Sequence, residues 1–160
     1  MKKKVGLFLF LALVLALVAI ASPALGRAGG ATVPFKVECT TYPEVDDSGF
    51  PILIVTIPAD CIGTHLAISD WYGDTLVDLT VYPALQTGTM EFTAANGAQL
   101  FGNIDGEAIP NDIGGFDYWG DYWITSGTGR FEGYTGSGIY YGGAGGGVGT
   151  LTFEGTLTRP

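Results

Sequence analysis

Two five-residue segments of the chain share one pattern, in which an aspartate is followed by two aromatic residues, a glycine and a second aspartate. They are Asp70-Trp71-Tyr72-Gly73-Asp74 and Asp117-Tyr118-Trp119-Gly120-Asp121. Aromatic faces stack on sugar rings and flat aromatic groups, while neighbouring carboxylates accept hydrogen bonds from hydroxyls. The pattern therefore predicts ligand-binding residues in these segments and directly after the second one: Trp71, Tyr72, Tyr118, Trp119, Tyr122 and Trp123.

The same two segments also have a purely structural interpretation. Glycine and aspartate are common in turns, and aromatic residues pack against each other across neighbouring strands. Both segments fall at the expected ends of strands, where turns begin. Two hairpins of similar composition would produce this pattern without any ligand, and this is the simpler interpretation.

Residue patterns that carry known catalytic chemistry are missing from the chain. No Gly-x-Ser-x-Gly nucleophile motif occurs, and the glycine-rich run at 142–147 has no lysine, which predicts a hairpin tip rather than a phosphate-binding loop. His65 is the only histidine, and a lone histidine in a strand-like segment is more often a structural hydrogen-bond donor than a general base. The 16 acidic residues form neighbouring pairs by chance, so no pair identifies an acid–base site.

The sequence also predicts no metal site and no cofactor. Two cysteines and one histidine cannot complete a tetrahedral zinc site. Acidic residues gather around Asp46-Asp47 and in the two aromatic segments, but the chain has no Asp-x-Asp-x-Asp-Gly loop and no calcium-binding nonapeptide repeat. We therefore expect neither zinc nor calcium.

The first 26 residues have the three parts of a secretory signal peptide. Residues 1–4 are basic, residues 5–21 are an unbroken apolar run, and Ala24-Leu25-Gly26 provides small residues for cleavage. We expect cleavage after Gly26, which leaves residues 27–160 as one secreted or periplasmic domain. The alternative is a retained anchor, although 17 apolar residues fall short of the roughly 20 that span a bilayer. In either case, only this segment is expected to contact a membrane.

The expected mature chain is strongly acidic. Residues 27–160 contain four basic and 16 acidic residues, which gives a formal charge of 4 − 16 = −12. Such a surface repels phosphate backbones, and nucleic acids are therefore excluded as partners.

Cys39 and Cys61 are the only cysteines, and export would place them in an oxidising compartment. A bridge between residues 22 positions apart would stabilise the fold by about 3 kcal/mol in the chain-entropy model. We therefore expect a disulfide, with two separate buried thiols as the alternative.

Short β-branched and aromatic runs, bounded by Gly, Pro, Asn or Asp, recur along the chain after residue 30. No sustained 3.6-residue apolar period interrupts them, and 24 glycines in 134 residues disfavour helices. The runs predict eight or nine strands, which form a closed antiparallel barrel or, alternatively, a β-sandwich. The predicted strands are 35–42, 52–57, 64–69, 75–82, 87–94, 99–108, 118–125, 130–141 and 149–158.

Alternation is clearest in residues 150–158, where apolar residues or glycine occupy the odd positions and Thr or Glu the even ones. The pattern recurs at Met90, Phe92 and Ala94, and it predicts that each strand has one buried and one solvent-exposed face.

Turn residues add two further expectations. Asn96-Gly97 predicts a two-residue type I′ hairpin turn. The glycines at 133, 136 and 138 predict a bulge, a bend or a close backbone approach.

Four segments in this order resemble a group of secreted bacterial proteins with no known function. They are Gly63-Thr64-His65-Leu66 and the stretches 92–102, 127–138 and 149–157. The third segment begins with Gly-Thr-Gly-Arg-Phe, which is similar to a late strand of allene oxide cyclases and dirigent proteins. The resemblance covers residues 60–158 and implies the eight-stranded antiparallel barrel of these two families. Allene oxide cyclases bind an oxylipin in an apolar barrel, and dirigent proteins steer the coupling of phenoxy radicals. No acidic residue here matches a catalytic one in those families, so no catalytic role is transferred.

Three functions remain open at this point. The favoured hypothesis is a secreted barrel that binds a small apolar or aromatic ligand in its cavity or mouth without catalysis. The second is an isomerase or cyclase acting on a lipid or phenolic intermediate, which requires a carboxylate in an apolar lumen. The third is a structural envelope or matrix protein that associates with copies of itself. An outer-membrane barrel fits less well, because acidic residues recur through the predicted strands.

Overall fold

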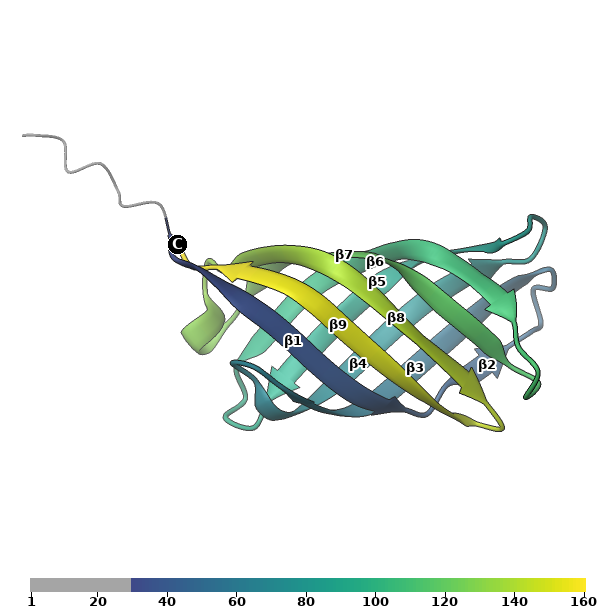
Figure 1. The fold of residues 1–160 in the computed structure, drawn as a ribbon, viewed down its shortest axis with the longest axis horizontal. Coiled ribbons are helices and arrows are strands. Elements are labelled where there is room, and N and C mark those ends of the chain that lie inside the picture. Colours follow the sequence, from purple (N-terminus) through teal and green to yellow (C-terminus); the bar gives the residue numbers. More distant parts are fainter. Residues whose placement is uncertain (1–29) are drawn as a thin grey trace, which may run out of the picture. The chain divides into compact units, whose positions relative to one another are not determined.

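A computed structural model describes residues 30–160 of the chain, and the predicted signal peptide at 1–26 lies outside these residues (Figure 1). The described part contains nine strands and one short 3₁₀ turn but no α-helix, and it therefore has no helix able to cross a membrane. The elements are β1 Thr32–Thr41, β2 Glu44–Asp46, β3 Ile52–Gly63, β4 Ala67–Asp78, β5 Ala84–Ala94, β6 Gln99–Pro110, β7 Phe116–Gly127, η1 Gly129–Phe131, β8 Thr135–Gly145 and β9 Val148–Thr158.

The strands form a closed antiparallel barrel, as predicted, and not the alternative sandwich. Their order is β1-β9-β8-β7-β6-β5-β4-β3, and β1 pairs again with β3 to close the sheet. Eight strands therefore make the wall, while the short strand β2 pairs with β3. A barrel of this size has an interior just wide enough for side chains to fill.

One end of the barrel, which we call the capped end, is closed by the β3–β4 turn and by the loop between β7 and β8. The side chains of Leu66 and Phe131 from these two segments are buried. Arg130 Nη2 donates a hydrogen bond of 2.7 Å to the backbone carbonyl of His65 and fastens one segment to the other. His65 Nε2 lies 3.1 Å from the carbonyl oxygen of Pro34, which agrees with a structural role for this histidine.

The opposite end, which we call the open end, is formed by β2 and by the turn between β8 and β9. Gly146 and Gly147 form that turn, and both have positive φ (64° and 86°), so the glycine-rich run is the predicted hairpin tip. β1 pairs with β9 only as far as Thr41 and Gly149. Beyond this point the chain continues into β2, whose pairing within the sheet is with β3.

Several strand boundaries differ from the sequence-based prediction. The predicted strand 64–69 is wrong, because the chain reverses there through His65 and Ala67, which have φ of 64° and 59°. The first aromatic segment therefore lies inside β4 and not at a strand end, whereas the second begins at the second residue of β7. The predicted type I′ turn is also wrong, since Gly97 has positive φ but Asn96 does not.

The glycines at 133, 136 and 138 divide between two roles. Gly133 has φ of 76° and belongs to the loop that follows η1, which delays the start of β8 to Thr135. Gly136 and Gly138 lie inside β8, where a Cβ atom would collide with backbone carbonyls of β9. The predicted close backbone approach is therefore confirmed for these two residues.

The half of the lumen next to the capped end is filled by aromatic side chains. Five rings lie in contact there, with centroids 5.1–6.4 Å apart: Phe35, Trp71, Phe92, Tyr122 and Phe153. All five side chains are buried. Tilted and edge-to-face rings of this kind add to the burial of apolar area, so this half of the lumen is the packed core.

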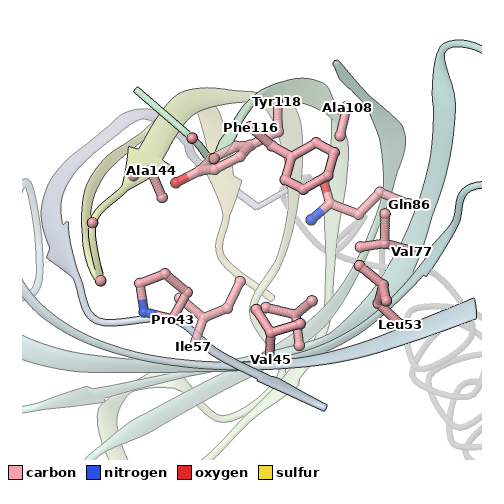
Figure 2. A pocket seen from close by; sticks show the side chains of 16 residues that line it. Pro43, Val45, Leu53, Ile57, Val77, Gln86, Ala108, Phe116, Tyr118 and Ala144 are labelled. Carbon is pink, nitrogen blue, oxygen red and sulfur yellow. The ribbon is translucent and has the colours of Figure 1, made fainter. Parts of the chain in front are cut away.

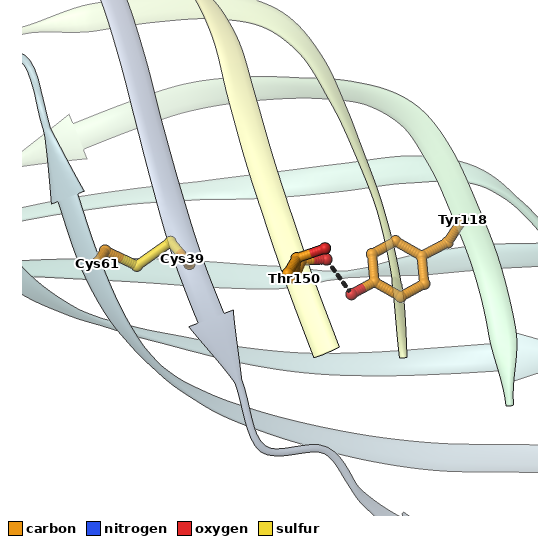
Figure 3. Close-up of a disulfide and its surroundings, with 4 residues drawn as sticks. All are labelled: Cys39, Cys61, Tyr118 and Thr150. Carbon is orange, nitrogen blue, oxygen red and sulfur yellow. Dashed lines mark hydrogen bonds between the residues drawn. A yellow bond between two sulfur atoms is a disulfide. The ribbon is translucent and has the colours of Figure 1, made fainter. Parts of the chain in front are cut away.

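The predicted disulfide joins Cys39 of β1 to Cys61 of β3 (Figure 3). The two cysteines are direct partners in the β1–β3 register, and both side chains are buried. This pairing spans five residue pairs, whereas β1 and β9 share ten. The bond therefore crosses the shortest pairing in the barrel wall, and it is consistent with an oxidising, extracellular or periplasmic location.

We expect Cys39→Ala/Cys61→Ala to lower the free energy of unfolding by about 3 kcal/mol, because the bridge restricts a 22-residue separation in the unfolded chain. Urea unfolding of the oxidised protein, the reduced protein and the double variant measures this loss. Reduced wild-type protein should match the double variant closely. Equal stability of all three forms would contradict a stabilising bridge.

Candidate functional site

A cavity of about 190 Å³ occupies the half of the lumen next to the open end (Figure 2). Figure 2 shows side chains from opposite sides of the barrel arranged around an unfilled centre. The residues that line it are Pro43, Val45, Leu53, Val55, Ile57, Val77, Gln86, Ala108, Gly114, Gly115, Phe116, Tyr118, Ala144, Gly145, Gly146 and Gly147.

The cavity exists because the inward side chains are small here. Ala108 of β6 and Ala144 of β8 each contribute only a methyl group to the lining, and five further lining residues are glycines. The β8–β9 turn contributes only glycine to the rim. The pairing of β1 with β9 ends at Thr41. Beyond this point, the part of the wall between β3 and β9 is formed by β2, which pairs with β3, and by the glycine turn.

Two polar side chains, Gln86 and Tyr118, line an otherwise apolar cavity. The Tyr118 hydroxyl donates a 2.9 Å hydrogen bond to the carbonyl oxygen of Thr150 (Figure 3), and burial raises the pKa of its phenol. The Gln86 side-chain oxygen accepts a 3.0 Å hydrogen bond from the hydroxyl of Tyr140. Burial also raises the pKa of the Tyr140 phenol well above its ordinary value, so this group stays protonated and donates at neutral pH.

No carboxylate lines the cavity, and none of the 16 acidic residues, all within the described range, is buried. The cyclase hypothesis requires a lumen carboxylate, and residues 30–160 do not provide one.

Residues 30–160 also contain no group of three or more His, Cys, Asp or Glu side chains that could hold a metal. Asp46, one of the acids considered for calcium, instead accepts a hydrogen bond from the backbone of Ser48, which lowers its pKa.

The six predicted ligand-binding residues do not form one site, because adjacent side chains in a strand point to opposite faces. Trp71 and Tyr122 point inward and belong to the packed aromatic cluster. Tyr118 also points inward, and it is the one of the six that lines the cavity. The remaining three, Tyr72, Trp119 and Trp123, are exposed on the outer face.

The outer face of β6 and β7 has a shallow hollow between Trp119 and Trp123. The carboxylates of Asp105 and Asp121 are direct cross-strand partners in it, and Glu107 lies beside them. No basic side chain lines the hollow. Like charges directly opposite each other in a sheet are destabilising, so this pair weakens the fold slightly.

Sequence reasoning missed most of the cavity, including Gln86, Phe116 and the β2 residues. A usable signal existed for Gln86. The inward pattern of Met90, Phe92 and Ala94 extends back through Gly88 to Gln86, but the predicted strand began at residue 87. β2 gave no comparable signal, because three residues with a single apolar side chain are too few to establish a strand pattern.

Comparison with known proteins adds no further constraint on the site. No family model matches the chain, and the search of curated proteins found no match. The resemblance to allene oxide cyclases and dirigent proteins therefore stays a prediction. The geometry of the cavity is the basis for any functional argument.

We expect Asp121→Asn to raise the free energy of unfolding by about 0.5 kcal/mol at low salt, because it removes the repulsion from Asp105. Asp105→Asn should give a similar gain, and the double variant should gain less than the sum. Urea unfolding at low salt and in 0.5 M NaCl measures the gains, which should shrink as salt screens the charges. Additive, salt-independent gains would contradict this account.

Proposed function

We propose that this protein binds one small, uncharged and mainly apolar ligand in the cavity at the open end of the barrel, without chemically changing it. The observation that carries the proposal is the uneven filling of the lumen. Aromatic rings pack the capped half, whereas the open half retains a cavity of about 190 Å³ with apolar walls. Apolar pockets with a few placed polar groups are the usual form of small-molecule sites.

The volume limits the size of the ligand. An engineered apolar cavity of about 150 Å³ holds benzene, so 190 Å³ accepts about eight to ten non-hydrogen atoms. One ring with a short substituent or a short branched chain fits within this limit. A long-chain oxylipin, the ligand implied by the resemblance to allene oxide cyclases, would extend beyond the cavity.

Charge limits the ligand further. No charged side chain lines the cavity, so an ionised group would enter it without a partner, which is energetically costly. Residues 30–160 carry three basic and 16 acidic residues, a formal charge of 3 − 16 = −13, which also repels anions. The proposal therefore specifies an uncharged ligand.

The proposed binding takes place outside the cytoplasm, as the predicted signal peptide and the disulfide both support. The cyclase alternative is less well supported, because the carboxylate that it requires does not line the cavity. The structural alternative rests on self-association, which light scattering measures separately.

We expect Val45→Trp to weaken ligand binding at least tenfold, because Val45 lines the cavity from β2 and a larger side chain there would fill the mouth. Its side chain is 58% exposed, so the strand should tolerate the change. Ile54→Trp is the matched control, since Ile54 is 49% exposed and does not line the cavity. Titration with propylbenzene, followed by calorimetry or amide NMR shifts, measures the affinity.

A dissociation constant between about 10 μM and 1 mM is expected for a ligand of this size. Saturable binding to wild type and the Ile54 variant, together with loss in the Val45 variant, supports the proposal. Absence of binding to wild type, or equal binding to all three proteins, would overturn it.

A further inference from the structure

The side chain of Gln86 is a polar group held at one side of the apolar cavity. It is 4% exposed and lies on the inward face of β5. Its amide oxygen accepts the hydrogen bond from Tyr140, which leaves the amide nitrogen as the free end of the group. Figure 2 shows this nitrogen pointing into the unfilled centre of the cavity.

The orientation of the Gln86 amide is fixed from behind by Tyr140. The Tyr140 ring crosses inward glycines of β6 and β7, since a Cβ atom at Gly106 would lie 2.5 Å from its hydroxyl oxygen and one at Gly120 would lie 2.8 Å from the ring. The ring also packs against Phe153, with centroids 6.2 Å apart. These contacts restrict the Tyr140 ring, and its hydroxyl therefore holds the Gln86 oxygen and directs the nitrogen toward the cavity.

The nitrogen of Gln86 makes no hydrogen bond with any side chain or backbone group of the described residues. Tyr118, the other polar residue in the cavity wall, already donates to Thr150. The nitrogen borders the cavity, so a ligand that fills the cavity and displaces water from it must supply an acceptor, because a buried N–H group without one is costly. A hydrocarbon cannot provide the acceptor, and a carboxylate would bring an unpaired charge into the cavity.

We propose that the ligand of this cavity is a small neutral carbonyl compound, such as a ketone, an aldehyde or a lactone, whose oxygen accepts a hydrogen bond from the Gln86 amide nitrogen. This inference rests on the proposed function and specifies its ligand class. The apolar walls hold the ring or chain of the ligand, and Gln86 fixes its polar end. Tyr140 is a positioning residue that acts through Gln86.

Three ligands of nearly equal size test the proposal: acetophenone, isopropylbenzene and benzoate. The ketone should bind wild-type protein about tenfold more tightly than the hydrocarbon, as expected for one hydrogen bond, and benzoate should bind more weakly than either. The side-chain amide resonances of Gln86 should shift with acetophenone and not with isopropylbenzene. Affinities are measured by calorimetry or NMR titration of the folded protein.

Gln86→Met keeps the approximate size of the side chain and removes the donor. In this variant the preference for acetophenone should fall to about one, with isopropylbenzene still bound. Tyr140→Phe should reduce the preference because the amide is no longer held. Tyr122→Phe is the matched control, since the Tyr122 hydroxyl has no hydrogen-bond partner and does not line the cavity, so the preference should remain tenfold.

The outcomes separate this inference from the function on which it rests. If wild type binds both neutral ligands with equal affinity, or if neither the Gln86 nor the Tyr140 variant changes the ratio, the carbonyl proposal is wrong and the apolar binding site stands. If wild type binds none of the ligands, both proposals fall. Should the Gln86 variant not fold, the wild-type ratio and the two tyrosine variants still decide between these outcomes.

Discussion

The width of an eight-stranded lumen is the constraint on which the rest of this structure depends. Such an interior is filled only when large and small inward side chains are matched across the barrel. In the capped half they are matched: the Tyr122 hydroxyl, for example, extends to Gly155, where a Cβ atom would lie 2.6 Å away. In the open half, Ala108 and Ala144 leave space that their neighbours Phe116 and Tyr118 do not fill, and the unfilled volume becomes the cavity. A few inward positions therefore decide whether the lumen is fully packed or keeps a cavity.

The way in which the barrel closes supports the same division. The strand that begins as β1 is shared between β9 and β3 in the capped half and continues as β2 beside β3 at the open end. The strand pairing is thus continuous around the aromatic cluster, whereas near the cavity β2 pairs with β3 and not with β9. The disulfide between Cys39 and Cys61 joins β1 to β3 two residues before β1 ends at Thr41, and therefore lies next to this transition.

The sequence predicted the fold better than the site, and the reason is physical. Alternation, turn residues and two cysteines depend on neighbours along the chain, and they were sufficient for an all-β fold with a disulfide. They left barrel and sandwich open, and the preference for a barrel came from the family resemblance. The site depends on which inward positions are small, and this requires the register. Trp71 and Tyr72 are adjacent in sequence but lie on opposite faces, so a cluster of aromatic residues in sequence did not become a cluster in space. Gln86 has an ordinary sequence context, and Tyr140, which fixes its amide by a hydrogen bond, lies 54 residues away in the sequence.

Xenon binding tests most directly whether the open half of the lumen is an unfilled apolar site. Xenon enters dry apolar cavities without requiring any particular ligand chemistry. A crystal structure of the protein under xenon pressure should show one xenon atom in the lumen, between Leu53, Val77 and Phe116, and none within the aromatic cluster. A lumen without xenon, or one in which ordered waters fill this half, would contradict the account.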